Sequence, residues 1–263
     1  MESNKIIHCI GDSHASFFSG YDQIQPTYPE ASINKFPFFR SYRLGAVLAY
    51  SLNKLNTNER GREKLLMLIN ELPPKSELLL CFGEIDCRCH LVKHSKLSGE
   101  PLTKVVEDCV INYFKVVDEL KEAGFHVMIW NVIPTADAIN NEYPTFGSHA
   151  ERNQCTSIFN KILQRKCRER GLLFLSIFDK LMTKKFKTRR VCFFDAVHLG
   201  QISMPFVFKR LLSFKPQLTL HGYSKVEIEI SVLNSILIVM CMTVLLDGKV
   251  LIKKIFKRST LHD

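Results

Sequence analysis

The sequence predicts an α/β fold, a three-layer α/β/α sandwich around a central parallel sheet of the flavodoxin-like kind. Short, nearly continuous apolar runs are typical of strands that are covered on both faces. Longer stretches with apolar residues three and four positions apart indicate amphipathic helices, and the two kinds of segment alternate along the chain. With 263 residues, 46% of them hydrophobic, the chain is long enough to bury a large core.

The predicted strands are five short apolar runs, of which the last is the weakest. They cover residues 5–10, 77–82, 126–133, 172–177 and 191–194. Long segments separate these runs, so parallel pairing with right-handed crossovers is expected.

The predicted helices fill most of the space between the strands. They are expected over residues 42–55, 60–71, 101–123 and 149–170. The third has the clearest apolar periodicity, with Pro101 at its start and Gly124 just past its end, and Gly171 ends the fourth in the same way.

The composition changes after about residue 215, which divides the chain into a main domain, 1–215, and an extension, 216–263. Residues 230–246 carry no charge, and five cations follow: Lys249, Lys253, Lys254, Lys257 and Arg258. One interpretation is a segment that meets a membrane surface through residues 230–258, either as a short span or as a peripheral attachment. The other is a buried appendage in which the alternating residues 226–230 form a strand, followed by a helix.

The formal net charge of +10 is compatible with a solvated basic surface or with an anionic partner such as a glycan or a lipid. No nucleic-acid-binding motif accompanies the charge, so no nucleic-acid partner is expected. The nine cysteines are odd in number and several lie in predicted strands, a pattern that favours a reducing compartment. Because the first residues lead directly into a short strand and not into a signal peptide, we expect a cytoplasmic protein.

A cluster with the residue types of a zinc site lies in the segment Cys87-Arg88-Cys89-His90, with His94 nearby. No second Cys/His cluster completes it. We therefore expect no metal and no cofactor.

Three polar segments each follow a predicted strand. They are Gly11-Asp12-Ser13-His14, Gly83-Glu84-Ile85-Asp86 and Asp195-Ala196-Val197-His198. Residues just past the carboxyl ends of parallel strands share one crevice, so these segments are expected to meet. Ser13 could serve there as a nucleophile, His198 as its general base, and Asp195 as the carboxylate that orients the imidazole. This combination predicts acyl-transfer chemistry.

The first and last of these segments resemble sequence blocks of the SGNH/GDSL hydrolase superfamily. In that family Gly-Asp-Ser after the first strand carries the nucleophile, and Asp-x-x-His supplies the other two catalytic groups. The resemblance covers about residues 5–213 and implies catalytic roles for Ser13, Asp195 and His198. The variant Gly-Asp-Ser-His is similar to enzymes that add or remove acyl groups on sugars, and residues 82–88 are similar to a bacterial subgroup associated with surface polysaccharide.

The oxyanion of the tetrahedral intermediate needs hydrogen-bond donors. The backbone N–H of Ser13 is one candidate, and the resemblance suggests the backbone N–H of a second-block glycine, for which Gly45 is the candidate. In the third block, Gly83-Glu84-Ile85-Asp86, the family has Gly-x-Asn-Asp with an oxyanion-binding Asn. Ile85 stands at that position and cannot donate, a loss worth on the order of 2.7–4 kcal/mol.

Three other residues are candidates for replacing the missing donor or for binding substrate: His14, Arg88 and Asn131. Arg88 could also bind a carboxylate or phosphate. Alternatively, Glu84, Asp86 and Arg88 form a structural ion-pair network at the end of a strand. The sequence leaves both interpretations open.

The function expected from these residues is that of a serine esterase acting through an acyl-serine intermediate. An O-acetylated carbohydrate is the substrate that the resemblance suggests, and the apolar extension suggests a lipid ester as the alternative. An O-acyltransferase would share the same acyl-enzyme. A weakened SGNH fold that only binds a carbohydrate or lipid is the non-enzymatic alternative, and the sequence does not indicate an oligomeric state.

Overall fold

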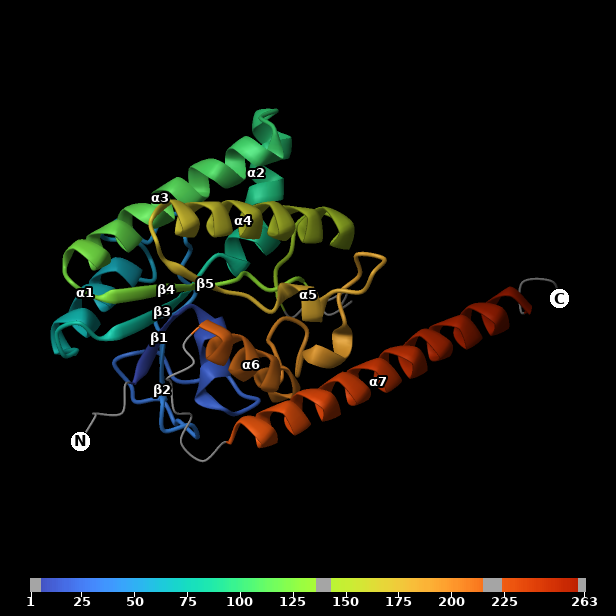
Figure 1. Ribbon diagram of the computed structural model, residues 1–263. Helices are drawn as coiled ribbons and strands as arrows, with labels where there is room; N and C mark the ends of the chain where they lie inside the picture. Colours follow the sequence, from blue (N-terminus) through green and yellow to red (C-terminus); the bar gives the residue numbers. More distant parts are fainter. Residues whose placement is uncertain (1–5, 136–142, 215–223, 260–263) are drawn as a thin grey trace.

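The computed structural model describes residues 6–135, 143–214 and 224–259, with side chains of the last helix described as far as Met242. A five-stranded sheet of order β2-β1-β3-β4-β5 forms its centre, and every pairing is parallel. The strands are β1 (Ile7–Gly11), β2 (Phe39–Arg43), β3 (Glu77–Cys81), β4 (His126–Trp130) and β5 (Leu173–Leu175). Helices cover both faces, so the predicted α/β fold with a parallel central sheet is confirmed (Figure 1).

Helices α1, α3 and α4 pack on one face of the sheet, and the short helix η1 with α6 packs on the other. Their bounds are α1 (Gly61–Glu71), α3 (Leu102–Glu122), α4 (His149–Glu169), η1 (Ser13–Ser19) and α6 (Met204–Phe214). The first three match the helices predicted over 60–71, 101–123 and 149–170. Alternate residues of each strand point to opposite faces, so Ile10 belongs to the first core and Cys9 to the second.

The remaining elements lie around the carboxyl ends of the strands. They are the π-helix η2 (Asp86–His90), α2 (Leu91–Ser98), α5 (Phe178–Leu181), η3 (Arg190–Cys192) and η4 (Gln201–Ser203). Residues 191–194 are not a strand of the sheet, contrary to the prediction. The chain reverses there, and Phe193 makes a single antiparallel bridge to Leu199.

The predicted helix over 42–55 is wrong. Its first residues end strand β2, and residues 44–60 form turns and loops. The helix-like spacing arose because Leu44, Val47 and Leu52 enter the core from a loop. The backbone N–H of Ala49 donates to the Asp86 carboxylate at 2.8 Å, which satisfies it without a helix.

The extension forms one long helix, α7 (Lys225–Ser259), which packs against α6 and η3 and then continues beyond the domain (Figure 1). Residues 226–230 form the first turns of this helix, and not the strand that their alternating pattern suggested as one interpretation. A capping box explains this, because Ser224 N donates to Glu227 Oε2 at 2.7 Å and Glu227 N donates to Ser224 Oγ at 3.2 Å. Within the described part of the chain, none of the helices has the length and apolar character needed to cross a bilayer.

Candidate active site

The sheet register places three of the predicted site residues, Ser13, Gly45 and Gly83, at the same distance past the ends of neighbouring strands. Gly11, the last residue of β1, pairs with the last residues of both β2 and β3. Ser13, Gly45 and Gly83 each follow these paired positions by two residues. Since carboxyl ends of adjacent parallel strands share one edge, the nucleophile candidate has a glycine-containing turn on either side.

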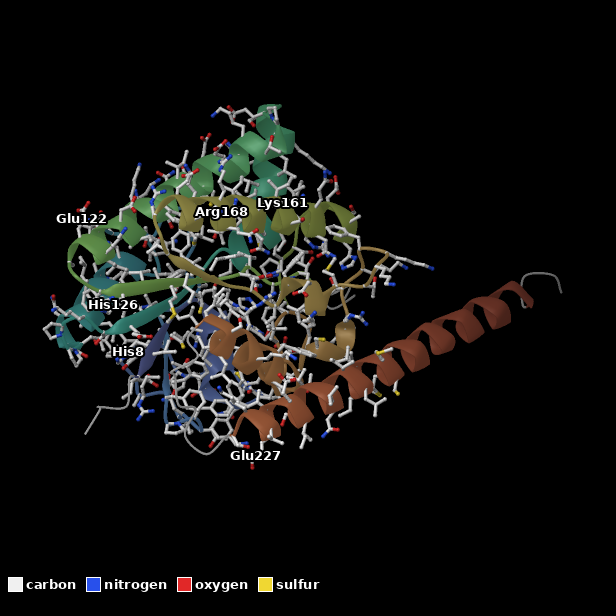
Figure 2. All side chains as sticks on the ribbon, viewed as in Figure 1. His8, Glu122, His126, Lys161, Arg168 and Glu227 are labelled. Atoms are coloured by element: carbon white, nitrogen blue, oxygen red, sulfur yellow. The ribbon has the colours of Figure 1, made fainter. Side chains whose placement is uncertain are left out.

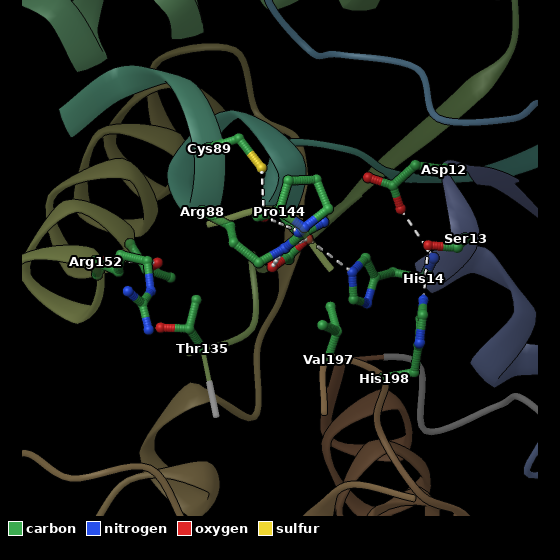
Figure 3. A network of polar contacts seen from close by, with 12 residues as sticks. Asp12, Ser13, His14, Arg88, Cys89, Thr135, Pro144, Arg152, Val197 and His198 are labelled. Atoms are coloured by element: carbon green, nitrogen blue, oxygen red, sulfur yellow. Dashed lines mark hydrogen bonds and ion pairs between the residues drawn. The ribbon is translucent and has the colours of Figure 1, made fainter. Parts of the chain in front are cut away.

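The triad candidates form a continuous chain of hydrogen bonds, of which Figure 3 shows the link between Ser13 and His198. His198 Nε2 lies 2.8 Å from Ser13 Oγ, and His198 Nδ1 lies 2.7 Å from Asp195 Oδ2. His198 is buried and Ser13 is half-buried. This geometry allows the imidazole to take the Ser13 proton while the carboxylate holds its other nitrogen.

Local structure orients Asp195 toward the imidazole. Its Oδ1 accepts the backbone N–H groups of Val197 at 2.8 Å and His198 at 2.6 Å, which leaves Oδ2 for the ring. Burial alone would raise the pKa of Asp195, but the hydrogen bonds from the His198 side chain and from these N–H groups hold it well below its usual value. The carboxylate therefore stays ionised where a serine hydrolase would work.

Aromatic rings surround the His198 imidazole. Phe194 stacks on it at 5.7 Å between ring centroids, His14 lies at 4.9 Å, and Tyr143 meets it edge-on at 5.5 Å. Tyr143 is not among the site residues predicted from the sequence. It lies outside every periodic segment and 52 residues before Asp195, so no local pattern could have indicated it.

Asp12 shapes the turn that carries the nucleophile. Its Oδ1 accepts the backbone N–H of His14 at 2.8 Å, and its own N–H donates to Cys81 O on β3 at 3.2 Å. Complete burial raises the pKa of Asp12 well above its usual value. Asp12 is therefore a buried structural group that shapes the turn of the nucleophile candidate, and it lies next to an ionised pair.

The ionised pair consists of Glu84 and Arg88, and His14 contacts Glu84 on the side of the triad. Arg88 Nε donates to both Glu84 oxygens, at 2.8 and 3.1 Å, and His14 Nε2 lies 3.2 Å from Glu84 Oε2. Burial would raise the pKa of Glu84, but the contacts with His14 and with the Arg88 guanidinium lower it to about 2. Burial lowers the pKa of His14, so a neutral imidazole lies between this ion pair and His198 (Figure 3).

Arg88 also fastens the chain segment that carries Tyr143. Its Nη1 donates to the carbonyl of Pro144, its backbone carbonyl accepts from Phe146 N at 3.0 Å, and its guanidinium lies 5.9 Å from the Tyr143 ring centroid. The side chain is buried. These contacts favour the structural interpretation of Glu84 and Arg88 over direct binding of substrate.

Asp86 and Asn131 also make structural contacts. Asp86 accepts the backbone N–H groups of Ala49 and Tyr50, which ties the loop after β2 to the third block. It also lines a cavity of about 430 Å³ beside α2, which none of the triad candidates line. Asn131 is fully buried, donates to Val132 O at 3.0 Å and accepts from Ile177 N at 2.8 Å, so it joins the ends of β4 and β5.

Gly45 and Gly83 both have backbone conformations that favour glycine, with φ of 111° and 112°. A Cβ at Gly45 would lie 2.3 Å from Glu59 Oε2, and one at Gly83 would lie 2.9 Å from atoms of Phe159 and Val132. Gly45 lies in the loop after β2 and not in a helix. Ile85, at the position of the family's Asn, is half-buried and offers no donor.

The chain matches no model of a known protein family and no protein of curated function. Among solved structures it is similar to the CTD of the Drosophila Oskar protein, with 13% identity, a TM-score of 0.47, and 78% of this chain and 85% of that chain covered. It is also similar to an alpha/beta hydrolase from the metagenome of Lake Arreo, Spain, with 13% identity and a TM-score of 0.49; the match covers 83% of this chain and 98% of that chain. A third similar structure is a carbohydrate acetylesterase from Sinorhizobium meliloti, with 14% identity and a TM-score of 0.47; the match covers 82% of this chain and 100% of that chain.

Proposed function

We propose that the protein is a serine esterase of the SGNH/GDSL type, with Ser13, His198 and Asp195 as its catalytic triad. The observation that carries the proposal is the unbroken chain from Ser13 Oγ through both ring nitrogens of His198 to Asp195 Oδ2, with links of 2.8 and 2.7 Å. A half-buried serine with a buried imidazole on its hydroxyl is the arrangement that activates a hydroxyl for attack.

In the proposed reaction, His198 Nε2 takes the Ser13 proton as Oγ attacks the ester carbonyl. The tetrahedral intermediate collapses, His198 gives the proton to the leaving alcohol, and the acyl group stays on Ser13. Water then attacks the acyl-serine, His198 takes the water proton and returns it to Ser13 Oγ, and the carboxylic acid leaves. Asp195 stabilises the imidazolium in both halves.

The backbone N–H groups of Ser13 and Gly45 are the proposed donors to the oxyanion. The register supports this pairing, because both residues follow adjacent strand ends by two positions. The positive φ of Gly45 turns its peptide out of the strand direction. Without the third-block Asn we expect a slower enzyme than one with three donors.

The proposed substrate is an O-acetylated carbohydrate. The support is the resemblance of Gly11-Asp12-Ser13-His14 and of residues 82–88 to sugar-modifying enzymes. Transfer of the acyl group to a sugar hydroxyl in place of water would use the same residues.

Fluorophosphonate labelling of the purified full chain tests the triad. We expect labelling of the wild type and its loss in both Ser13→Ala and His198→Ala. Ser98→Ala, at an exposed position at the end of α2, is the matched control and should label fully. Release of acetate from acetylated xylo-oligosaccharides, compared with p-nitrophenyl butyrate, then tests the substrate class.

One observation favours a second function, a binding module without turnover. Ile85 removes the side-chain donor that the resemblance would place at the oxyanion. A folded wild type that neither labels nor releases acetate, yet binds acetylated oligosaccharide in calorimetry, would replace the esterase by this second function.

A further inference from the structure

Helix α7 packs on the domain through one narrow stripe. Ile228, Val232, Ser235 and Val239 are buried, and their spacing of four, three and four residues places them on one side of the helix. This stripe belongs to the same core cluster as α6 and β1. Outside this stripe, Glu229 pairs with Lys209 of α6 at 2.8 Å, and Ile236 lines a cavity together with residues of the domain. Most of the other side chains between Ile230 and Met242 are exposed within the described part of the chain.

From residue 230 to residue 242 the surface outside the stripe is largely apolar, with Asn234 as an exposed polar side chain. The exposed large hydrophobic side chains from residue 230 to 242 are Ile230, Leu233, Ile236, Leu237, Ile238, Met240 and Met242. Leu233 and Leu237 are 63% and 62% exposed, and no residue from 230 to 242 is charged. A helix that only faces water carries polar residues on its outer side, so this surface indicates a further partner. Figure 2 shows side chains of α7 on the side away from the domain.

The width of the apolar surface distinguishes between possible partners. A second copy of α7 in a two-stranded pair would cover a single seam, for which Ile230, Leu233, Leu237 and Met240 have the required spacing of three and four. Ile238 and Met242 lie outside that seam and would stay in water. A continuous apolar medium, in contrast to a single partner helix, would contact all these positions at once.

The charge of the same helix indicates which apolar medium it meets. Five cations follow the apolar stretch: Lys249, Lys253, Lys254, Lys257 and Arg258. Each cation near an anionic bilayer adds attraction, and a helix with an apolar side and a basic end is suited to the boundary between headgroups and acyl chains. We propose that α7 attaches the protein to the surface of an anionic phospholipid bilayer. The proposal does not depend on the esterase function.

Vesicle flotation of the full-length protein tests this proposal. We compare vesicles of phosphatidylcholine alone with vesicles that contain 30% phosphatidylglycerol. We expect flotation with the anionic vesicles, which weakens in high salt and falls more than about tenfold in Leu233→Glu/Leu237→Glu. Both side chains are exposed, so the double variant should fold. Leu97→Glu, at a 76% exposed position of α2, is the matched control and should float like the wild type.

A charge variant, Lys253→Glu/Lys254→Glu, tests the choice of lipid. It should lose most of its preference for anionic vesicles. Equal flotation of the wild type and of Leu233→Glu/Leu237→Glu would overturn the proposal. So would a wild type that does not float but elutes as a dimer that the same double variant converts to a monomer, because the surface then joins two copies. Fluorophosphonate labelling of each variant reports on the triad separately.

Discussion

The Tyr143 hydroxyl donates to Asp195 Oδ2 at 3.3 Å, the same oxygen that accepts the hydrogen bond from His198 Nδ1. The ring of Tyr143 also meets the imidazole edge-on. Arg88, two residues after the third sequence block, donates to the carbonyl of Pro144, which directly follows Tyr143. This contact holds the tyrosine close to the triad. Tyr143 is thus placed to position Asp195 and to share its negative charge.

We expect Tyr143→Phe to lower kcat/KM by up to about fivefold, the worth of one modest hydrogen bond. The acid limb of the pH profile should move to higher pH, since Asp195 Oδ2 without its second donor holds the imidazolium proton more strongly. The profile for an acetate ester checks this, with Tyr50→Phe, an exposed tyrosine, as the control. A lower melting temperature with an unmoved acid limb would reduce Tyr143 to a packing role.

Ile85→Asn should restore a donor at the position where the resemblance has one. We expect kcat for p-nitrophenyl acetate to rise about tenfold or more, because a single oxyanion donor is commonly worth 10²–10³ in kcat. Ile85→Leu, which adds no donor, should leave kcat close to the wild-type value. No gain in a stably folded Ile85→Asn would mean that another group already fills this place.

Glu84→Gln should destabilise the protein in a pH-dependent way. The carboxyl pKa is lowered from 4.5 to about 2 in the folded protein, so its contribution is fully present above about pH 4.5 and is lost as the pH falls toward 2. This pKa difference corresponds to about 3 kcal/mol, and breaking a buried pair commonly costs 3–5 kcal/mol. Urea unfolding at pH 7 and pH 3 measures the difference, which should be smaller at pH 3.

Glu100→Gln is the matched control for this change. Glu100 is partly exposed and lies 3.9 Å from His94, so its replacement should alter the free energy of unfolding little. Equal stability of wild type and Glu84→Gln at pH 7 would contradict the structural role given to the Glu84–Arg88 pair.

Gly83→Ala should be costly both in backbone strain and in packing. Its φ of 112° disfavours a side chain, and the new Cβ would lie 2.9 Å from Phe159 and from Val132. We expect a loss of about 2–4 kcal/mol in the free energy of unfolding. Gly124→Ala has a positive φ but open space around it, so it should lose only about 1 kcal/mol. Equal losses in the two variants would show that the contacts with Phe159 and Val132 add no cost to the substitution at Gly83.

Local pattern was sufficient for most of the architecture. Four apolar runs predicted β1, β3, β4 and β5, and apolar periodicity with its flanking Pro and Gly predicted α3, because buried strands and amphipathic helices repeat their contacts every few residues. The Ser13, Asp195 and His198 candidates were also found from sequence, since each lies in a short polar segment that follows a strand-like run. Their catalytic roles remain a proposal.

Tertiary structure decided the features that depend on contacts between distant residues. Residues 42–55 have helix-like spacing, yet Asp86 accepts the backbone N–H of Ala49 from 37 positions away, and residues 44–60 form a loop. Tyr143 reaches Asp195 from a segment without periodicity, and the buried Arg88 donates to both Glu84 and Pro144. Sequence periodicity records only which side of an element is apolar, whereas the partner of a buried polar group is set by how the elements pack.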